Sequence, residues 1–156
     1  MANVMNSKDA ITGSLAECYV TIEGNRYNFM QLYEFEAKYE MNIVDVPILG
    51  QASKGHKAVG GNGTWTGTAH FNQSIFRELL YRYQTNGEMI YFDIQVTNSD
   101  PTASVGRQTI ILKNCLMEGG ILTKFNADEE LLNEEISGTF DSWEMPEKFT
   151  NLNGMV

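Results

Sequence analysis

Hydrophobic and polar residues alternate along most of this chain, a pattern typical of β-strands with one buried and one exposed face. The first alternating segment covers residues 16–22, and the Gly24-Asn25 pair after it predicts a tight hairpin turn into residues 27–29. Further strands are predicted over residues 64–71, 89–97, 107–117, 121–126 and 136–143. Turn residues separate these segments, so the pattern indicates a mainly β protein.

The most regular alternation covers residues 33–43. One face carries the apolar side chains Tyr33, Phe35, Ala37, Tyr39, Met41 and Ile43, and the other carries Glu34, Glu36, Lys38, Glu40 and Asn42. We therefore expect one face in the core and the other in water. At about 3.3 Å per residue the segment reaches roughly 36 Å, which is longer than most strands. A strand of this length needs neighbours of similar length.

Residues 47–63 interrupt the alternation and contain five glycines. They show neither helical nor strand periodicity, so we predict a long mobile loop. Loops longer than about 12 residues in compact domains are usually functional or disordered.

A single helix is predicted from Ser74 to about Thr85. Its apolar stripe has helical spacing, Ser74 is suited to the N-cap, and Gly87 lies just beyond the end. Such a helix can close one open side of a β core. No internal repeat is visible, so we expect one domain over residues 1–156, with an extended tail at 146–156.

Length and composition narrow the function classes. A chain of 156 residues can bury a substantial core, and no apolar run approaches the roughly 18 residues of a membrane span. Residues 1–10 lack the pattern of a secretory signal, which predicts synthesis in the cytosol. With 11 basic and 20 acidic residues, and no basic cluster on one face, specific nucleic-acid binding is disfavoured.

Motifs for catalysis or cofactors are incomplete. Residues 50–57 have the glycine spacing of a phosphate-binding loop but lack its lysine. His56 and His70 belong to no metal-binding motif, and the acidic run at 128–135 lacks the pattern of a calcium loop. Cys18 and Cys115 are too few for a disulfide framework or a zinc site, and we interpret both as buried small hydrophobes. We expect no cofactor and no metal.

Two alternative functions remain open from the residues themselves. An enzyme could use the carboxylates of Glu34, Glu36 and Glu40, which would require a concave pocket. A small-ligand or carbohydrate-binding β-sandwich could use Trp65 and Trp143 as a platform, although both tryptophans occupy alternating positions expected to point inward.

The order of the landmarks carries a family resemblance. The chain has an early Ile11-Thr12-Gly13 start, the Gly24 hairpin, the Glu-rich long strand, and then Leu49-Gly50 with a glycine and lysine loop that closes on Gly67-Thr68-Ala69. With the ending at residues 140–149, this order resembles phage tail-tube proteins. More narrowly, it resembles the tube subunits of contractile tails in Gram-positive phages and in R-type bacteriocins of the defective-prophage and diffocin kind.

The resemblance implies a β-barrel or orthogonal β-sandwich with one flanking α-helix, similar to the type VI secretion tube. It also implies a non-enzymatic structural subunit that stacks as hexameric rings into a channel penetrating the target cell envelope. Its partners would be sheath, tape-measure and baseplate or tube-initiator proteins, with assembly in the bacterial cytoplasm. Edge-to-edge joining of long strands would hide the edges that a monomer exposes.

Two sets of residues follow as candidate sites under this resemblance. The channel would be lined by the polar face of the long strand, namely Glu34, Glu36, Lys38, Glu40 and Asn42. Contacts between subunits would come from the predicted loop, at Leu49, Gly50, Lys54, Gly55, His56, Lys57, Gly60 and Gly61.

Overall fold

A computed structural model describes residues 4–156, which form eight strands, one α-helix and one short 3-10 helix. In chain order the elements are η1 (Ser7–Asp9), β1 (Ala16–Ile22), β2 (Asn25–Asn28), β3 (Leu32–Val46), β4 (Gly55–His70), α1 (Ile75–Asn86), β5 (Phe92–Ser99), β6 (Arg107–Gly119), β7 (Asn133–Phe140) and β8 (Ser142–Glu147). Of the strands predicted from the sequence, only residues 121–126 have no counterpart.

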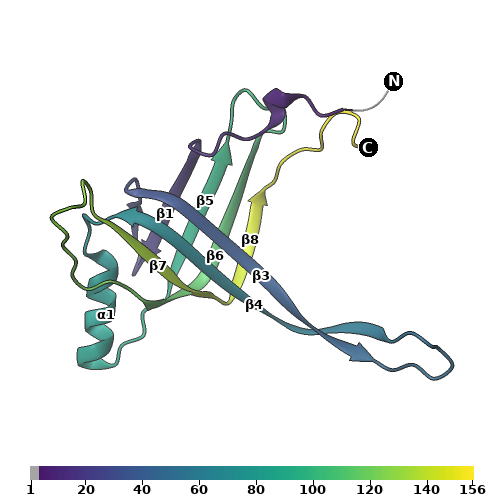
Figure 1. Ribbon diagram of the computed structural model, residues 1–156, viewed down its shortest axis with the longest axis horizontal. Helices are drawn as coiled ribbons and strands as arrows, with labels where there is room; N and C mark the ends of the chain where they lie inside the picture. Colours follow the sequence, from purple (N-terminus) through teal and green to yellow (C-terminus); the bar gives the residue numbers. More distant parts are fainter. Residues whose placement is uncertain (1–3) are drawn as a thin grey trace.

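The strands form one antiparallel sheet that folds over at β6. Its order is β2-β1-β5-β6-β7-β4-β3, and β8 also pairs with β6. The first part of β6 pairs with β5 and β8, whereas its last residues pair with β7. As a result β3, β4 and β7 cross over β1, β5, β6 and β8 (Figure 1). The mainly β fold with one flanking helix, predicted from the sequence, is confirmed.

A bulge marks the point where the sheet changes direction. Between Phe92 and Ile94 the register with β6 shifts, and Asn114 on β6 adopts a left-handed φ of 52°. The Asn114 backbone N–H donates to the Asp93 carboxylate at 3.3 Å. Because a bulge bends a strand and increases its twist, it lets one β6 strand serve both halves of the sheet.

An aromatic cluster joins the two halves of the sheet to the helix. Trp65 of β4 lies edge-on to Phe92 of β5 at 6.1 Å between ring centroids, and Phe76 of α1 contacts both rings at 6.3 and 5.5 Å. Phe29 packs edge-on against Phe76 at 5.1 Å. Trp65 is 1 % exposed, so this cluster is the centre of the core.

The limits of the helix agree with the prediction to within one residue, although the Ser74 side chain at the N-cap forms no capping hydrogen bond. Gly87 follows it with a left-handed φ of 71°, and its N–H donates to the Tyr83 carbonyl at 2.8 Å. Glycine adopts this conformation without the steric cost that a Cβ would impose.

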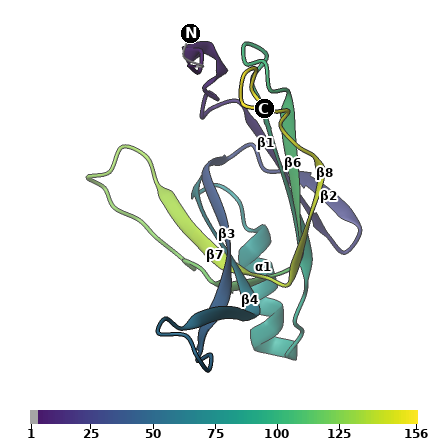
Figure 2. The ribbon, with the colours of Figure 1, turned by 90° about the vertical axis from the view of Figure 1, so that its right-hand side faces the viewer.

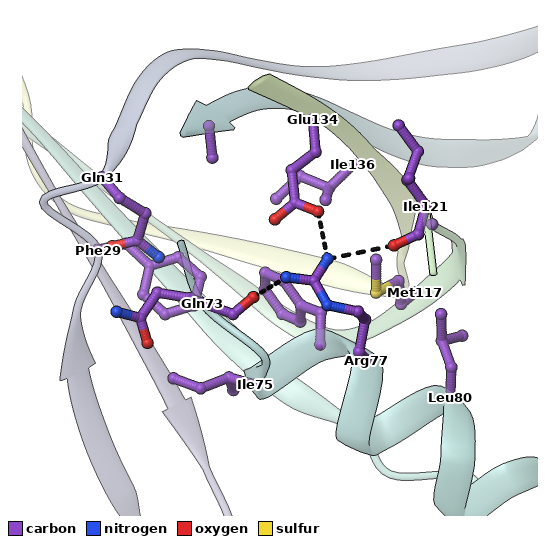
Figure 3. Close-up of a pocket in the computed structure, with 13 residues that line it drawn as sticks. Phe29, Gln31, Gln73, Ile75, Arg77, Leu80, Met117, Ile121, Glu134 and Ile136 are labelled. Atoms are coloured by element: carbon purple, nitrogen blue, oxygen red, sulfur yellow. Dashed lines mark hydrogen bonds and ion pairs between the residues drawn. The ribbon is translucent and has the colours of Figure 1, made fainter. Parts of the chain in front are cut away.

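A buried ion pair attaches the start of α1 to β7 (Figure 3). Arg77 donates to the Glu134 carboxylate at 2.5 Å, to the Ile121 carbonyl at 3.1 Å and to the Gln73 carbonyl, and its guanidinium lies over the Phe71 ring. The cavity beside it holds about 20 Å³, enough for about one water. This interior site is therefore structural and has no room for a ligand.

The predicted loop at 47–63 is wrong in its second half. Only residues 47–54 form the connection, because β4 begins at Gly55 and pairs with β3 from there. Alternation is invisible over 55–63 because glycines have no side chain to reveal which face they occupy. At the other end of the chain, β8 includes Pro146 and Glu147, so the irregular tail begins two residues later than predicted, at 148.

Candidate assembly surfaces

The β3–β4 hairpin extends well beyond the rest of the molecule (Figure 1). Gly63 is the outermost residue of β4 that pairs with β7, opposite Phe140. Beyond that point β3 and β4 pair only with each other, so we define residues 40–62 as the arm. Its two strands have no covering layer within one subunit.

The apolar face of β3 enters the core only near its start, which corrects the prediction from alternation. Phe35 stacks on Trp65 at 6.1 Å between ring centroids. Tyr39, Met41 and Ile43 are 48 %, 61 % and 59 % exposed, and Tyr33 is exposed as well. The alternation continues although the subunit offers nothing to cover it. A contiguous exposed apolar face of this kind marks an interaction site.

The tip of the arm, which we define as residues 47–57, is apolar and basic. Leu49 is fully exposed beside Gly50, whose φ of 85° forms the turn. Residues 47–62 contain Lys54 and Lys57 but no acidic residue. Neither lysine forms an ion pair within residues 4–156. These unpaired cations lie on a chain with a net charge of −9.

The remaining residues of the predicted contact loop belong to the paired part of the arm. Gly55, His56 and Lys57 begin β4, and His56 lies 3.4 Å from Asp45 across the hairpin. Gly60 has a φ of 148° at a register shift, which identifies a bulge.

The Tyr39 side chain packs directly over Gly61. A Cβ at this position would lie 2.1 Å from the Tyr39 hydroxyl oxygen, because the Tyr39 ring covers the glycine. Glycine inside a strand often marks such a close approach. The glycines of residues 55–63 therefore serve strand packing as well as the bulge, in place of the mobility expected from the sequence.

The polar face of β3 continues across two neighbouring strands. Glu34, Glu36, Lys38 and Glu40 pair with Thr68, Thr66, Thr64 and Asn62 of β4, which in turn lie beside Glu135, Ser137 and Thr139 of β7. Asn42 follows on the arm, beside the bulge. The only cation on β3, Lys38, lies 3.7 Å from Glu36. The structure thus places all five predicted channel residues on one exposed, mainly acidic surface.

A second projection was not foreseen. The β6–β7 loop, residues 120–132, leaves the body in Figure 2 and exposes Phe125 to 92 %, with Leu122 and Leu131 at 69 %. The alternation of residues 121–126, which predicts a strand, is the sequence feature that could have indicated apolar side chains on this projection. In the acidic run that follows, Asp128, Glu129 and Glu130 are exposed, whereas Glu134 is buried against Arg77.

Reactive or metal-binding groups do not gather on the described part of the chain. Among residues 4–156 no cluster of His, Cys, Asp and Glu could hold a metal ion. Burial raises the pKa of the Cys18 and Cys115 thiols to about 12, so both stay protonated and inert at neutral pH. Cys115 is fully buried and Cys18 half-buried. Trp143 is 44 % exposed, contrary to the inward position expected for it.

No helix within residues 4–156 combines the length and apolar character needed to cross a bilayer.

Comparison with known families decides the class of protein. The model of the family described as "Phage tail tube protein" matches residues 3–147. The chain belongs to this family. The tube protein is 32 % identical over 117 residues to the phage-like element PBSX protein XkdM of Bacillus subtilis (strain 168), covering 75 % of this chain and 80 % of the relative. The resemblance to phage tail-tube proteins, seen in the order of sequence landmarks, is thereby confirmed, and the tube protein has a structural role.

Solved structures share the fold at low sequence identity. A chain from the anti-feeding prophage baseplate matches with a TM-score of 0.65 at 11 % identity, covering 93 % of the tube protein and 97 % of that chain. A chain from the sheath-tube complex of the PVC extracellular contractile injection system matches with a TM-score of 0.60 at 12 % identity, covering 82 % and 86 %. The tube protein therefore has the fold found in contractile injection systems.

Proposed function

We propose that the tube protein stacks as hexameric rings to form the inner tube of a contractile phage tail or tail-like bacteriocin. The arm carries this proposal. It exposes an ordered apolar face, including Met41 and Ile43, that a single subunit leaves uncovered. Within a stack, that face would be buried against a neighbouring subunit, and the contact residues named from the sequence, between 49 and 61, would lie at the same interface. The 47–54 connection would order there as well.

Ring closure would also cover the free edges of the sheet. β3, with 15 residues, lies at one end of the strand order and β2 at the other. A long unpaired edge strand is a template for pairing with another chain. Joining subunits edge to edge supplies that pairing and limits it to a closed assembly.

In this arrangement the acidic face of β3, β4 and β7 lines the channel. Glu34, Glu36, Glu40 and Glu135 give it a negative surface that repels phosphate groups and acidic protein segments. Cargo would therefore slide without sticking. The tube has no catalytic role in this proposal.

The proposed partners follow from the place of a tube in such a particle. A sheath surrounds the tube, a tape-measure protein occupies its channel, and a baseplate initiator begins its growth. Chains of similar fold come from a sheath-tube complex, a baseplate and a tube-terminating cap, which supports these partners. Assembly would take place in the bacterial cytoplasm, with the whole chain acting as a single tube domain.

Negative-stain electron microscopy of the purified protein at rising concentration tests the assembly. We expect rings or tubes with a central channel, because each subunit exposes an unpaired edge and an apolar arm. Slow assembly is compatible with this expectation, since the initiating proteins are absent. Light scattering that shows only monomer at every concentration and salt condition would contradict the proposal.

Replacing Glu34, Glu36 and Glu40 together by Gln tests the channel. Tubes carrying this triple variant are expected to form and to bind sheath normally but to lose cation preference in bilayer conductance, because most of the negative charge of the wall is gone. The control replaces Glu78, Glu130 and Glu144, which are exposed residues on α1, on the β6–β7 loop and on β8. If the triple variant forms normal tubes that no longer bind sheath, the acidic face lies on the outside.

A further inference from the structure

An open apolar groove lies between the C-terminal half of α1 and strands β5 and β6. It holds about 330 Å³, and its lining includes Leu80, Tyr83, Met89, Leu116 and Met117. Tyr83 and Met89 are 57 % and 58 % exposed. The volume is at the lower end of the roughly 300–1,000 Å³ typical of ligand pockets, which suits a few apolar side chains.

Two carboxylates complete the lining of the groove. Glu88 and Glu118 are both exposed residues on an otherwise apolar surface. Glu88 accepts from Arg82 at 2.8 Å, whereas Glu118 has no ion-pair partner within residues 4–156. The groove therefore offers an apolar floor with negative charge beside it.

The arm tip has the complementary character. Leu49 is fully exposed and Ile48 is 43 % exposed, so the tip presents two apolar side chains. Lys54 and Lys57 accompany them without an acidic partner. Lys54 lies in the connection between the two strands of the arm, and Lys57 lies near the start of β4.

The arm tip and the groove of one subunit cannot meet. In Figure 1 the arm leaves the body on one side while α1 lies on the other, with the crossed strands between them. The β3–β4 pairing holds the arm extended in that direction. An arm tip that fills the groove must therefore belong to a second copy of the chain.

We propose that the arm tip of one subunit docks into the α1 groove of a second copy. Leu49 and Ile48 pack against the apolar lining of the groove, and Lys54 and Lys57 face Glu118 and Glu88. This contact rests on the proposed tube and names the surface that receives the arm. A single contact would thus cover the open groove and supply carboxylates to the two lysines that have no acidic partner in the subunit.

Disulfide cross-linking in assembled tubes tests the contact. The variant carries Leu49→Cys and Met89→Cys, and its two native thiols are inert because burial raises the pKa of each to about 12. Mild oxidation is expected to give a ladder of covalent oligomers on a non-reducing gel. The control pairs Leu49→Cys with Met30→Cys, since Met30 is an 81 % exposed methionine outside the groove. It should remain monomeric on the same gel.

A charge exchange supplies the second measurement. Replacing Lys54 and Lys57 by Glu is expected to raise the concentration needed for assembly at least tenfold, and adding Glu118→Lys should recover part of that loss. The control variant replaces Lys8 and Lys148 by Glu, because these lysines are also exposed and form no ion pair within the described chain. It should assemble like the wild type.

The outcomes distinguish a failure of this docking contact from a failure of the proposed tube. If the wild type never assembles, the proposed function fails and the contact fails with it. If the wild type forms tubes but the variant with Leu49→Cys and Met89→Cys cross-links no better than the control variant, the docking site is wrong and the tube stands. Cross-linking of the Leu49→Cys tip to a sheath or tape-measure protein in complete particles, in place of a second copy, also overturns it.

Discussion

Replacing Trp65 by Ala is expected to lower the free energy of unfolding by about 3–5 kcal/mol, the usual loss for a large aromatic side chain in a core. Trp65 is 1 % exposed and contacts Phe35, Phe76 and Phe92, so its removal leaves a cavity where the sheet halves and the helix meet. It also removes the indole hydrogen bond to the Thr139 carbonyl. At roughly 2–4 °C per kcal/mol, the Tm should fall by about 6–20 °C.

The measurement is urea unfolding below the concentration at which the protein polymerises. Trp143→Ala is the matched control, because Trp143 is 44 % exposed on β8. The loss in free energy of unfolding for this variant should stay near the roughly 0.5 kcal/mol of ordinary surface substitutions. Equal losses for the two tryptophan variants would show that the core does not depend on Trp65.

Gly138→Ala is expected to be at least as damaging, although it adds only one methyl group. A Cβ on Gly138 would lie 2.1 Å from the Leu116 carbonyl oxygen and 2.8 Å from the Trp65 ring. Overpacking usually costs about 1–3 kcal/mol, and here the obstacle is backbone that no side-chain rotation can move. Removing the clash requires β6 and β7 to separate, so we expect the free energy of unfolding to fall by about 3 kcal/mol or more.

Gly119→Ala provides the comparison, since Gly119 lies on β6 and a Cβ there meets nothing within 4 Å. Circular dichroism melting of the two variants should show a large drop in Tm for position 138 and little change for position 119. A Gly138→Ala protein that melts like the wild type would mean that β6 and β7 do not approach as closely as described.

The arm shows why alternation predicts a strand correctly but misassigns its environment. Period-two patterning reports that one face of β3 is apolar, and it holds from Tyr33 to Ile43. It cannot report what covers that face. Phe35 contacts Trp65, whereas Met41 lies beyond the last residue pair between β4 and β7 and is 61 % exposed. The same pattern therefore describes both a buried face and an exposed one.

The glycine-rich segment shows the opposite limitation. Residues 55–63 contain four glycines, and a glycine carries no sign of the face it occupies. The sequence predicts a loop there, yet the segment pairs with β3 along its length. The reason lies in distant residues, because the Tyr39 and Phe140 rings fill the space above Gly61 and Gly63.

Local signals in the sequence determined the elements of this protein and its class. Ser74 and Gly87 delimit α1, the alternation at 16–22 gives β1, and the order of landmarks identifies the family. These features depend on neighbouring residues or on order along the chain. Tertiary structure alone decided the pairing of Arg77 with Glu134, the extended arm and the groove beside α1. Each of these features depends on contacts between residues far apart in sequence. A pattern of neighbouring residues carries no information about which distant segments meet.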